Sequence, residues 1–287
     1  MNDTIHITKA SGKRAEFSEK KLRNSLQRTG ATEDQIDGVI SEIAKQLYEG
    51  ISTKRIHELA FDLLKENAGH LAAKYHLKQA IMELGPSGYP FEKYIGEILR
   101  CQGYGVKIGV TIKGQCVQHE IDVLAQLGQL QVMIECKYHN LPGIVCDVKI
   151  PLYIQSRFKD LEAQWKKFPE QGINQYQGWV VTNTRFSNDA MQYGLCVGLK
   201  LIGWDSPGKG SLKDQIDSLG LYPITCLTSL TKEEKQNLLD KKIVLCQELY
   251  YNPKILEQTG VNPSRVAIAL EETQQLCKQL RPLENSK

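Results

Sequence analysis

The clearest alternation of hydrophobic and polar residues lies in the middle of the chain, over residues 117–140. It predicts two β-strands joined by a short glycine-containing turn. In the second strand, the two-residue period places Glu135 and Lys137 on one face and points Cys136 the other way. In the first strand, Asp122 points away from its apolar neighbours. Charged side chains among β-branched residues cost stability unless they act together, so this segment is a candidate functional site.

The N-terminal part of the chain predicts a β-hairpin followed by helices. Residues 4–17 alternate around a Ser-Gly turn, which is typical of two short strands. Ser18, Thr32 and Ser52 each precede an amphipathic stretch, where they suit helix N-caps, and Gln35 completes a capping box with Thr32. A fourth helix is expected before the Gly-Pro-Ser-Gly-Tyr-Pro stretch, which we interpret as a linker.

The middle of the chain predicts a mixed arrangement of strands and helices. Residues 177–183 form a run of large apolar side chains, the pattern of a buried strand. The order helix, three strands, crossover, strand, helix, strand favours an αβ sandwich around a mixed sheet. Besides the strand pair, we expect helices at residues 91–103, near 157–160 and at 188–198, and strands at residues 106–111 and 199–205.

The last third of the chain is expected to be helical. Thr231 with Glu234 forms a capping box at the start of one helix. The following stretch faintly resembles a helix-hairpin-helix DNA-binding unit, but Lys241 and Lys242 replace the hairpin glycine, which favours a packing or assembly module. The fold class is therefore multi-domain α+β and α/β, with a small C-terminal helical domain. The predicted domains are residues 1–86, 87–205 and 206–287.

Composition narrows the class of protein. The 287 residues carry a net charge of +3, too little for a dedicated nucleic-acid coat protein, so any nucleic acid must bind a local groove. None of the eight cysteines forms a CxxC pair, which argues against a zinc ribbon or a redox motif and fits a reducing cytoplasm. No apolar run approaches the length of a membrane span. We therefore expect a soluble cytoplasmic protein with no membrane partner, and expect it to form a homo-oligomer.

The N-terminal segment resembles the ATP-cone, a nucleotide-sensing domain. The resemblance rests on ITKASGKRAEF, on a Lys-Leu pair in the first helix, and on YEGISTKRIHEL and AAKYHLKQAI, and it covers roughly residues 3–84. It implies a fold of a β-hairpin plus a helical bundle, with ATP or dATP as the effector. By position, Lys9 and Lys21 would hold phosphates, Thr53 would lie beside the nucleotide, and His57 is placed less securely.

One position departs from the ATP-cone pattern. The family has arginine after the strand lysine, whereas this chain has Ala10, so that Lys13 or Arg14 would supply the missing charge from the turn. Lysines that converge on a hairpin and a helix start suit a triphosphate, because each is a mobile point charge. Two other interpretations stay open. In the first, Lys9 and Lys21 are ordinary solvated surface lysines. In the second, the cone only mediates assembly.

The middle segment resembles the PD-(D/E)xK nuclease superfamily, in its Mrr-like type IV restriction endonuclease branch. The resemblance spans about residues 87–205 and rests on FEKYIGEIL, HEIDVLA, IECKYHN and VVTNTRFSNDAMQYG. It implies a restriction-endonuclease-like fold, a metal-binding pair at Asp122 and Glu135, a catalytic Lys137 and a further acid at Glu92. The proline that often precedes the aspartate is replaced by Ile121.

The chemistry explains why these residue types belong together. Two carboxylates about 4 Å apart repel by roughly 4 kcal/mol at an effective dielectric constant of 20, and a divalent ion converts that repulsion into ligation. Asp122, Glu135 and the carbonyl of Cys136 would hold Mg²⁺ or Mn²⁺ through hard oxygen ligands. Lys137 would orient the attacking water and neutralise the transition state, and Glu92 would hold a water or a second ion. The competing interpretation is a solvated set of surface salt bridges.

The sequence thus favours a metal-dependent DNA endonuclease of restriction or defence type that senses a nucleotide. A non-catalytic, nucleotide-gated DNA-binding regulator is the alternative, and a junction resolvase or an RNA-directed nuclease stays open within the enzymes. Arg157 is a candidate contact to backbone phosphate. The segment 182–185 is either a phosphate contact or a polar strand exit, and His119 is either a base or a loop residue.

Overall fold

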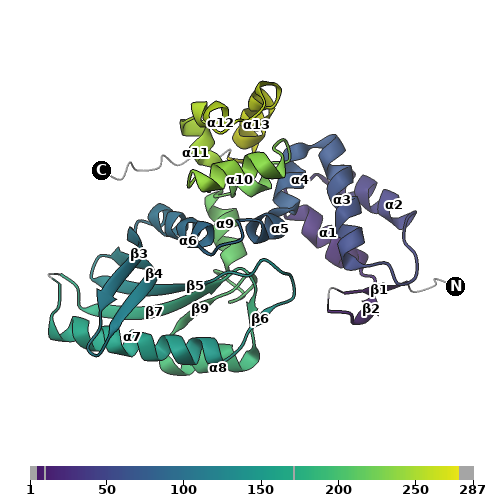
Figure 1. The fold of residues 1–287 in the computed structure, drawn as a ribbon. Coiled ribbons are helices and arrows are strands. Elements are labelled where there is room, and N and C mark those ends of the chain that lie inside the picture. The colour runs from purple at the N-terminus through teal and green to yellow at the C-terminus, as the bar shows by residue number, and fades with distance from the viewer. Residues whose placement is uncertain (1–4, 10, 171, 278–287) are drawn as a thin grey trace. The chain divides into compact units, whose positions relative to one another are not determined.

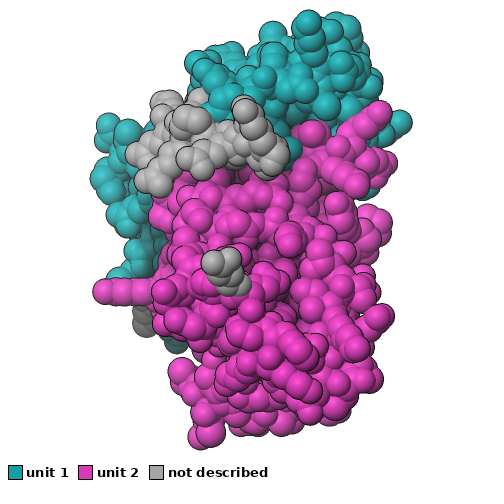
Figure 2. Space-filling model, turned by 90° about the vertical axis from the view of Figure 1, so that its left-hand side faces the viewer, with its two compact units in different colours: residues 1–80, 222–238, 246–277 teal, residues 81–221, 239–245, 278–287 magenta. Residues whose placement is uncertain are grey.

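The computed structural model describes residues 5–9, 11–170 and 172–277. They form two compact units, coloured separately in Figure 2. Unit 1 contains the chain up to Ala80 together with Tyr222–Leu238 and Cys246–Cys277. Unit 2 contains Ile81–Leu221 and Leu239–Leu245. Unit 1 is therefore built from both ends of the sequence, and most of unit 2 is the stretch of chain between them.

Unit 1 begins with the predicted hairpin and helices. The side chains of Ser18, Thr32 and Ser52 accept the expected N-cap hydrogen bonds, and Thr32 and Gln35 complete the capping box. The predicted fourth helix is divided into two at His76. The elements are β1 (His6–Thr8), β2 (Arg14–Glu16), α1 (Glu19–Gln27), α2 (Glu33–Ala44), α3 (Thr53–Asn67), α4 (Gly69–Tyr75) and α5 (Leu77–Met82).

The C-terminal helices share this unit. Helix α13 packs against α4, and the Thr225 hydroxyl donates a hydrogen bond to the Ala80 carbonyl at 2.7 Å. Because these contacts join segments far apart in the sequence, the N-terminal helices have a second packing partner within unit 1. The C-terminal elements are the 3₁₀ helix η1 (Ile224–Cys226), α10 (Lys232–Asp240), α11 (Cys246–Tyr251), α12 (Lys254–Gln258) and α13 (Pro263–Leu276).

A buried carboxylate connects α10 to α13. Glu234 accepts hydrogen bonds from the main-chain N–H groups of Thr231 and Asn262 and from the guanidinium of Arg265. These donors outweigh the effect of burial and lower the pKa of Glu234 from 4.5 to about 2. The capping box predicted from the sequence is thus confirmed, and its glutamate also reaches the start of the last helix.

Glu234→Gln is expected to destabilise the protein by roughly 1–3 kcal/mol at neutral pH, because charge-assisted hydrogen bonds are lost. The folded-state pKa is depressed, so the stabilisation is complete above pH 4.5 and is lost as the pH falls toward 2. Denaturant unfolding across this range should show the difference between variant and wild type shrinking as the pH falls. Glu233→Gln is the control, because that neighbouring side chain is exposed. A pH-independent difference would contradict the assignment.

Unit 2 is a mixed five-stranded sheet with helices on both faces (Figure 1). The strand order is β3-β4-β5-β7-β9, in which β3, β4 and β5 are antiparallel neighbours and β5, β7 and β9 are parallel. The sheet strands are β3 (Gly105–Lys113), β4 (Gln118–Leu127), β5 (Leu130–Lys137), β7 (Gln175–Thr182) and β9 (Lys200–Ile202). The mixed sheet expected from the sequence is therefore confirmed.

Helices cover the two faces separately. Helix α6 (Tyr89–Cys101) packs on β3, β4 and β5, and α7 (Lys149–Lys167) with α8 (Asn188–Val197) lies on the opposite face (Figure 1). Met133 and Val180 of the sheet share an apolar cluster with Phe158 and Leu161 of α7. Two short strands were not anticipated: β6 (Val145–Cys146) pairs in parallel with β8 (Arg185–Phe186). Helix α9 (Leu212–Leu219) lies in the part of the chain that was expected to be helical.

Strands β4 and β5 separate at the level of the charged residues. Their last shared pair is Val123 with Ile134, whereas β5 continues beside β7 as far as Lys137. Opposite Asp122 in β3 lies Gly109, whose φ of 62° is a left-handed conformation that only glycine adopts without strain. We call this opening, beyond the Val123–Ile134 pair, the β4–β5 fork.

No helix in the described part of the chain is both long and apolar enough to cross a membrane.

Candidate functional site

Asp122 lies inside the β4–β5 fork. Its carboxylate accepts a hydrogen bond from the main-chain N–H of Cys136 at 2.7 Å. That N–H points toward β4, where the ladder has already ended, so the side chain replaces a strand partner. Burial, followed by the charge of Glu135, raises the pKa of Asp122 to about 6. The Asp122 carboxylate therefore both accepts a main-chain bond at the end of β5 and faces the acidic side chain of Glu135.

Glu135 is held between two cations. It is 5% exposed, and its Oε1 lies 2.6 Å from the Lys137 ammonium while its Oε2 lies 2.5 Å from the Arg157 guanidinium. Arg157 also donates to the Glu120 carbonyl. The prediction that Glu135 and Lys137 share a face of β5 is therefore confirmed. A buried carboxylate is tolerated here because both of its oxygens have charged partners.

Glu92 comes to the same cluster from α6. Burial, followed by the negative charges of Asp122, Glu120 and Glu135, raises its pKa to about 7, although the charge of Lys137 lowers it. Three acids and a lysine predicted from separate segments therefore lie within electrostatic reach of one another. A fully solvated set of surface salt bridges would not bring these four side chains together.

The donor set suits a hard divalent ion. Asp122, Glu135 and the Cys136 carbonyl offer oxygen ligands of the kind that Mg²⁺ and Mn²⁺ prefer. The Cys136 thiol is excluded, since burial raises its pKa well above its ordinary value and keeps it protonated. Across the described residues, no three His, Cys, Asp or Glu side chains form a ready metal site. The carboxylates instead have amide and cationic partners, as the preceding contacts show.

Two side chains at the end of β7 fix the chain beyond Lys137. Thr182 donates a hydrogen bond to the Lys137 carbonyl at 2.7 Å. Asn183 accepts from the His139 N–H at 2.9 Å and donates to the His139 carbonyl at 2.7 Å. Thr182 and Asn183 are fully buried, so the segment 182–185 acts here as an internal clamp. The sequence signal was the run of small polar residues directly after a buried strand.

His119 has its partner outside the group of acids at the β4–β5 fork. It lies within β4, buried, and its Nε2 is 2.7 Å from the Asp160 carboxylate of α7. Asp160 also accepts from the main-chain N–H groups of Cys116 and Val117, and these donors lower its pKa to about 2. His119 therefore helps to attach the β3–β4 turn to α7, which was not anticipated from the sequence.

The residues predicted to bind a nucleotide lie around the hairpin of unit 1. Thr8 forms a bridge with Ser52, so Lys9 and Thr53 directly follow bridged residues. Lys21 lies in the first turn of α1. Lys9 and Lys21 are exposed and Thr53 is partly buried at the start of α3. The structure thus places Lys9 and Thr53 in adjoining segments.

Two of the predicted nucleotide residues have other partners. The Arg14 guanidinium lies 2.8 Å from the Glu49 carboxylate. The His57 ring stacks on Tyr75 with a centroid separation of 4.5 Å, and burial lowers its pKa. Ala10, the position that departs from the family pattern, lies outside the described residues. Arg14, one of the two residues expected to supply the missing charge, is paired with Glu49 in this structure.

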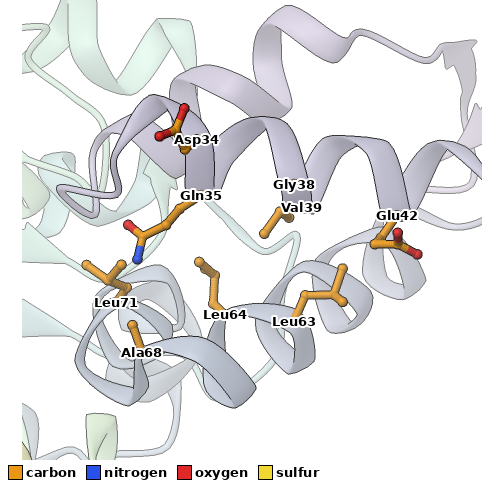
Figure 3. Close-up of a pocket in the computed structure, with 9 residues that line it drawn as sticks. All are labelled: Asp34, Gln35, Gly38, Val39, Glu42, Leu63, Leu64, Ala68 and Leu71. Carbon is orange, nitrogen blue, oxygen red and sulfur yellow. The ribbon is translucent and has the colours of Figure 1, made fainter.

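A hollow of about 490 Å³ lies elsewhere in unit 1, between α2 and the α3–α4 region (Figure 3). Its floor is apolar, and its charged lining consists of Asp34 and Glu42. None of the predicted nucleotide residues lines it. Two acids without a cation repel a triphosphate, so this hollow is not the predicted nucleotide site. It is lined by Asp34, Gln35, Gly38, Val39, Glu42, Leu63, Leu64, Ala68 and Leu71.

Comparison with known proteins identifies the relatives of the chain. It is 37% identical over 155 residues to an uncharacterized protein of Archaeoglobus fulgidus, with 54% of this chain and 83% of that protein covered. The solved structure of a protein of unknown function, AF1548, shares 32% identity with a TM-score of 0.54, and covers 66% of this chain and 98% of its own. The chain belongs to the AF1548-like family.

Two segments of this AF1548-like protein match separate family models. Residues 222–277 match the AF1548-like C-terminal region, and residues 5–79 match the ATP cone domain. The ATP-cone predicted from the N-terminal motifs is confirmed, and it supports the binding of a nucleotide effector. In the AF1548-like protein, both matched segments contribute to unit 1.

Two further solved structures are more distant from the AF1548-like protein. MspJI restriction endonuclease in complex with a 27-mer oligonucleotide shares 16% identity at a TM-score of 0.33, covering 51% of this chain and 31% of its own. Protein VC1899 from Vibrio cholerae shares 13% identity at a TM-score of 0.30, covering 70% and 52%. Similarities of this size carry no argument, so the nuclease branch stays a prediction.

Proposed function

We propose that this AF1548-like protein is a metal-dependent DNA endonuclease of restriction or defence type, whose activity responds to ATP or dATP at its ATP-cone. The observation that carries the proposal is the β4–β5 fork. There, Asp122, Glu135 and Lys137 lie together at the end of the sheet, with Arg157 paired to Glu135 and Glu92 within electrostatic reach. These are the residues that the PD-(D/E)xK resemblance names, together with an arginine it does not.

Each residue has a defined role in the proposed reaction. Asp122, Glu135 and the Cys136 carbonyl would hold Mg²⁺ or Mn²⁺. When bound, the ion supplies polarisation of the phosphate and a lowered pKa for water. The Lys137 ammonium, held by Glu135 at 2.6 Å, would neutralise negative charge that develops on the phosphate. Glu92, which lies in α6, would hold a water molecule beside the bound ion.

The test of the proposal is a cleavage assay on the wild-type protein. Supercoiled plasmid, single-stranded DNA, a four-way DNA junction and RNA would each be incubated with Mg²⁺, Mn²⁺ or EDTA, with and without ATP or dATP. We expect cleavage of DNA that depends on the divalent ion. Binding of DNA without cleavage of any substrate would instead favour the nucleotide-gated, non-catalytic regulator. Preferential cleavage of the junction or of RNA would identify one of the other nucleases.

The nucleotide part of the proposal has its own prediction. Lys21→Ala should weaken ATP binding by about tenfold, since an ammonium on a phosphate forms charge-assisted hydrogen bonds. Isothermal titration calorimetry with ATP measures the change. Lys20→Ala is a matched control, because Lys20 is an exposed lysine in the same helical turn. Equal ATP affinities in the two variants would mean that Lys21 is a surface lysine, as the competing interpretation holds.

A further inference from the structure

The carboxylate that should bind the divalent ion is already fully engaged. Both oxygens of Glu135 have a cationic partner, Lys137 on one and Arg157 on the other. Glu135 is 5% exposed, so water does not screen these charges strongly. A divalent ion that uses a Glu135 oxygen would face a positive charge at hydrogen-bond distance. Withdrawal of one of the two cations would remove this repulsion and leave one Glu135 oxygen to the ion.

Arg157 is the cation that has further contacts besides Glu135. Its guanidinium has several N–H groups, and the one not bonded to Glu135 donates to the Glu120 carbonyl. The guanidinium also lies over the Tyr153 ring, 5.5 Å from the centroid. These two contacts hold Arg157 at the β4–β5 fork even when its bond to Glu135 is broken. Its freed N–H groups would then face the place where a phosphate must bind, and guanidinium geometry matches phosphate oxygens.

We propose that Arg157 is an exchangeable counter-ion: it occupies Glu135 while no divalent ion is present, and it moves to the scissile phosphate when Glu135 takes up the ion. This inference rests on the proposed function, since it needs the divalent ion and the phosphodiester. It assigns to Arg157, a candidate phosphate contact from the sequence, a regulation by the divalent ion. DNA contact by Arg157 becomes available only after the ion has bound.

The decisive variant is Arg157→Gln, which removes the charge from Glu135. Titration of the metal-free protein with Mn²⁺ should show affinity about tenfold tighter than wild type, because a charged competitor for the carboxylate is gone. Lys159→Gln is the matched control. It removes a positive charge from the same helix, but Lys159 is exposed and paired with Glu162. Its Mn²⁺ affinity should equal that of the wild type.

The second measurement is DNA binding to a short duplex, by fluorescence anisotropy, with EDTA or with Ca²⁺. Without the ion, wild type and Arg157→Gln should bind equally, because Arg157 is held by Glu135. With Ca²⁺, the variant should bind about tenfold more weakly, and its salt dependence should fall by about one phosphate contact. A loss of equal size in both conditions would mean that Arg157 contacts DNA independently of the ion, and would overturn the proposal.

A structural role gives the opposite result. If Arg157 only orients Glu135 as a ligand, Arg157→Gln binds Mn²⁺ more weakly than wild type or equally well. Thermal unfolding establishes that the variant is folded. Should it not fold, Arg157→Met keeps much of the apolar length of the side chain without its charge, and its Mn²⁺ affinity should likewise exceed that of the wild type. Wild type that neither binds Mn²⁺ nor cleaves DNA refutes the proposed function, whereas wild type that does both, without a gain in the variant, refutes this inference alone.

Discussion

Asp122→Asn should lower the rate of DNA cleavage by about a thousandfold while the protein stays folded. The reason is that the two jobs of Asp122 are separable. The asparagine oxygen can still accept the Cys136 N–H bond that the carboxylate accepts at 2.7 Å, but it no longer carries the negative charge that an ion requires. The measurement is the initial cleavage rate at saturating Mg²⁺, together with the unfolding midpoint.

The control for this prediction is Asp189→Asn. Asp189 lies in the first turn of α8 and its side chain is exposed. The same change of charge at this position should leave the rate within a few-fold of wild type. Full activity of Asp122→Asn would show that the carboxyl is structural, and the cleavage mechanism would have to be sought elsewhere in the protein.

Asn183→Ala should destabilise the protein by roughly 2–4 kcal/mol and also reduce cleavage at least tenfold. Asn183 is fully buried, and its amide satisfies both the N–H and the carbonyl of His139. Alanine leaves both groups without that partner. The chain that follows Lys137 then loses a fixed position, so the ammonium is held less well against Glu135.

An asparagine at the other end of the same strand provides the control. Asn174 precedes β7, is exposed, and bonds to the Gln129 side chain at 3.0 Å. Asn174→Ala should change the free energy of unfolding by no more than about 0.5 kcal/mol and should leave cleavage intact. If Asn183→Ala lost stability but kept the wild-type rate at a temperature where it is folded, Asn183 would stabilise the fold without positioning Lys137.

Local sequence patterns predicted the local parts of the structure. Helix caps such as Thr32 with Gln35 depend on residues three apart, and the shared face of Glu135 and Lys137 depends on residues two apart. In both cases the partners are fixed by the geometry of one helix or one strand. The mixed sheet followed from the same reasoning, because the strand patterns were strong and their order restricts the possible topologies.

The contacts that organise the site depend on tertiary structure. Arg157 reaches Glu135 across 22 residues, and Asn183 reaches His139 across 44. Nothing in the spacing of these residues predicts that they meet. The alternation of apolar and polar residues does not reveal the β4–β5 fork either. Both strands keep their two-residue period beyond the point where the hydrogen bonds between them end. The sequence therefore named the acids and the lysine through a family resemblance, and Arg157 as a candidate phosphate contact. The structure added the pairing of Arg157 with Glu135 and the hydrogen bonds of Asn183 to His139.

The composition of unit 1 bears on how such a protein can be divided or recombined. The ATP-cone model ends at residue 79, yet α4 is covered by α13, and the Ala80 carbonyl is bonded to Thr225. A fragment cut at that border would lose the packing of α13 on α4 and the hydrogen bond from Thr225. We therefore expect the recognisable sensor to depend on the C-terminal helices for part of its stability. A gene fusion that transplanted it would need to carry the last helices along with the first.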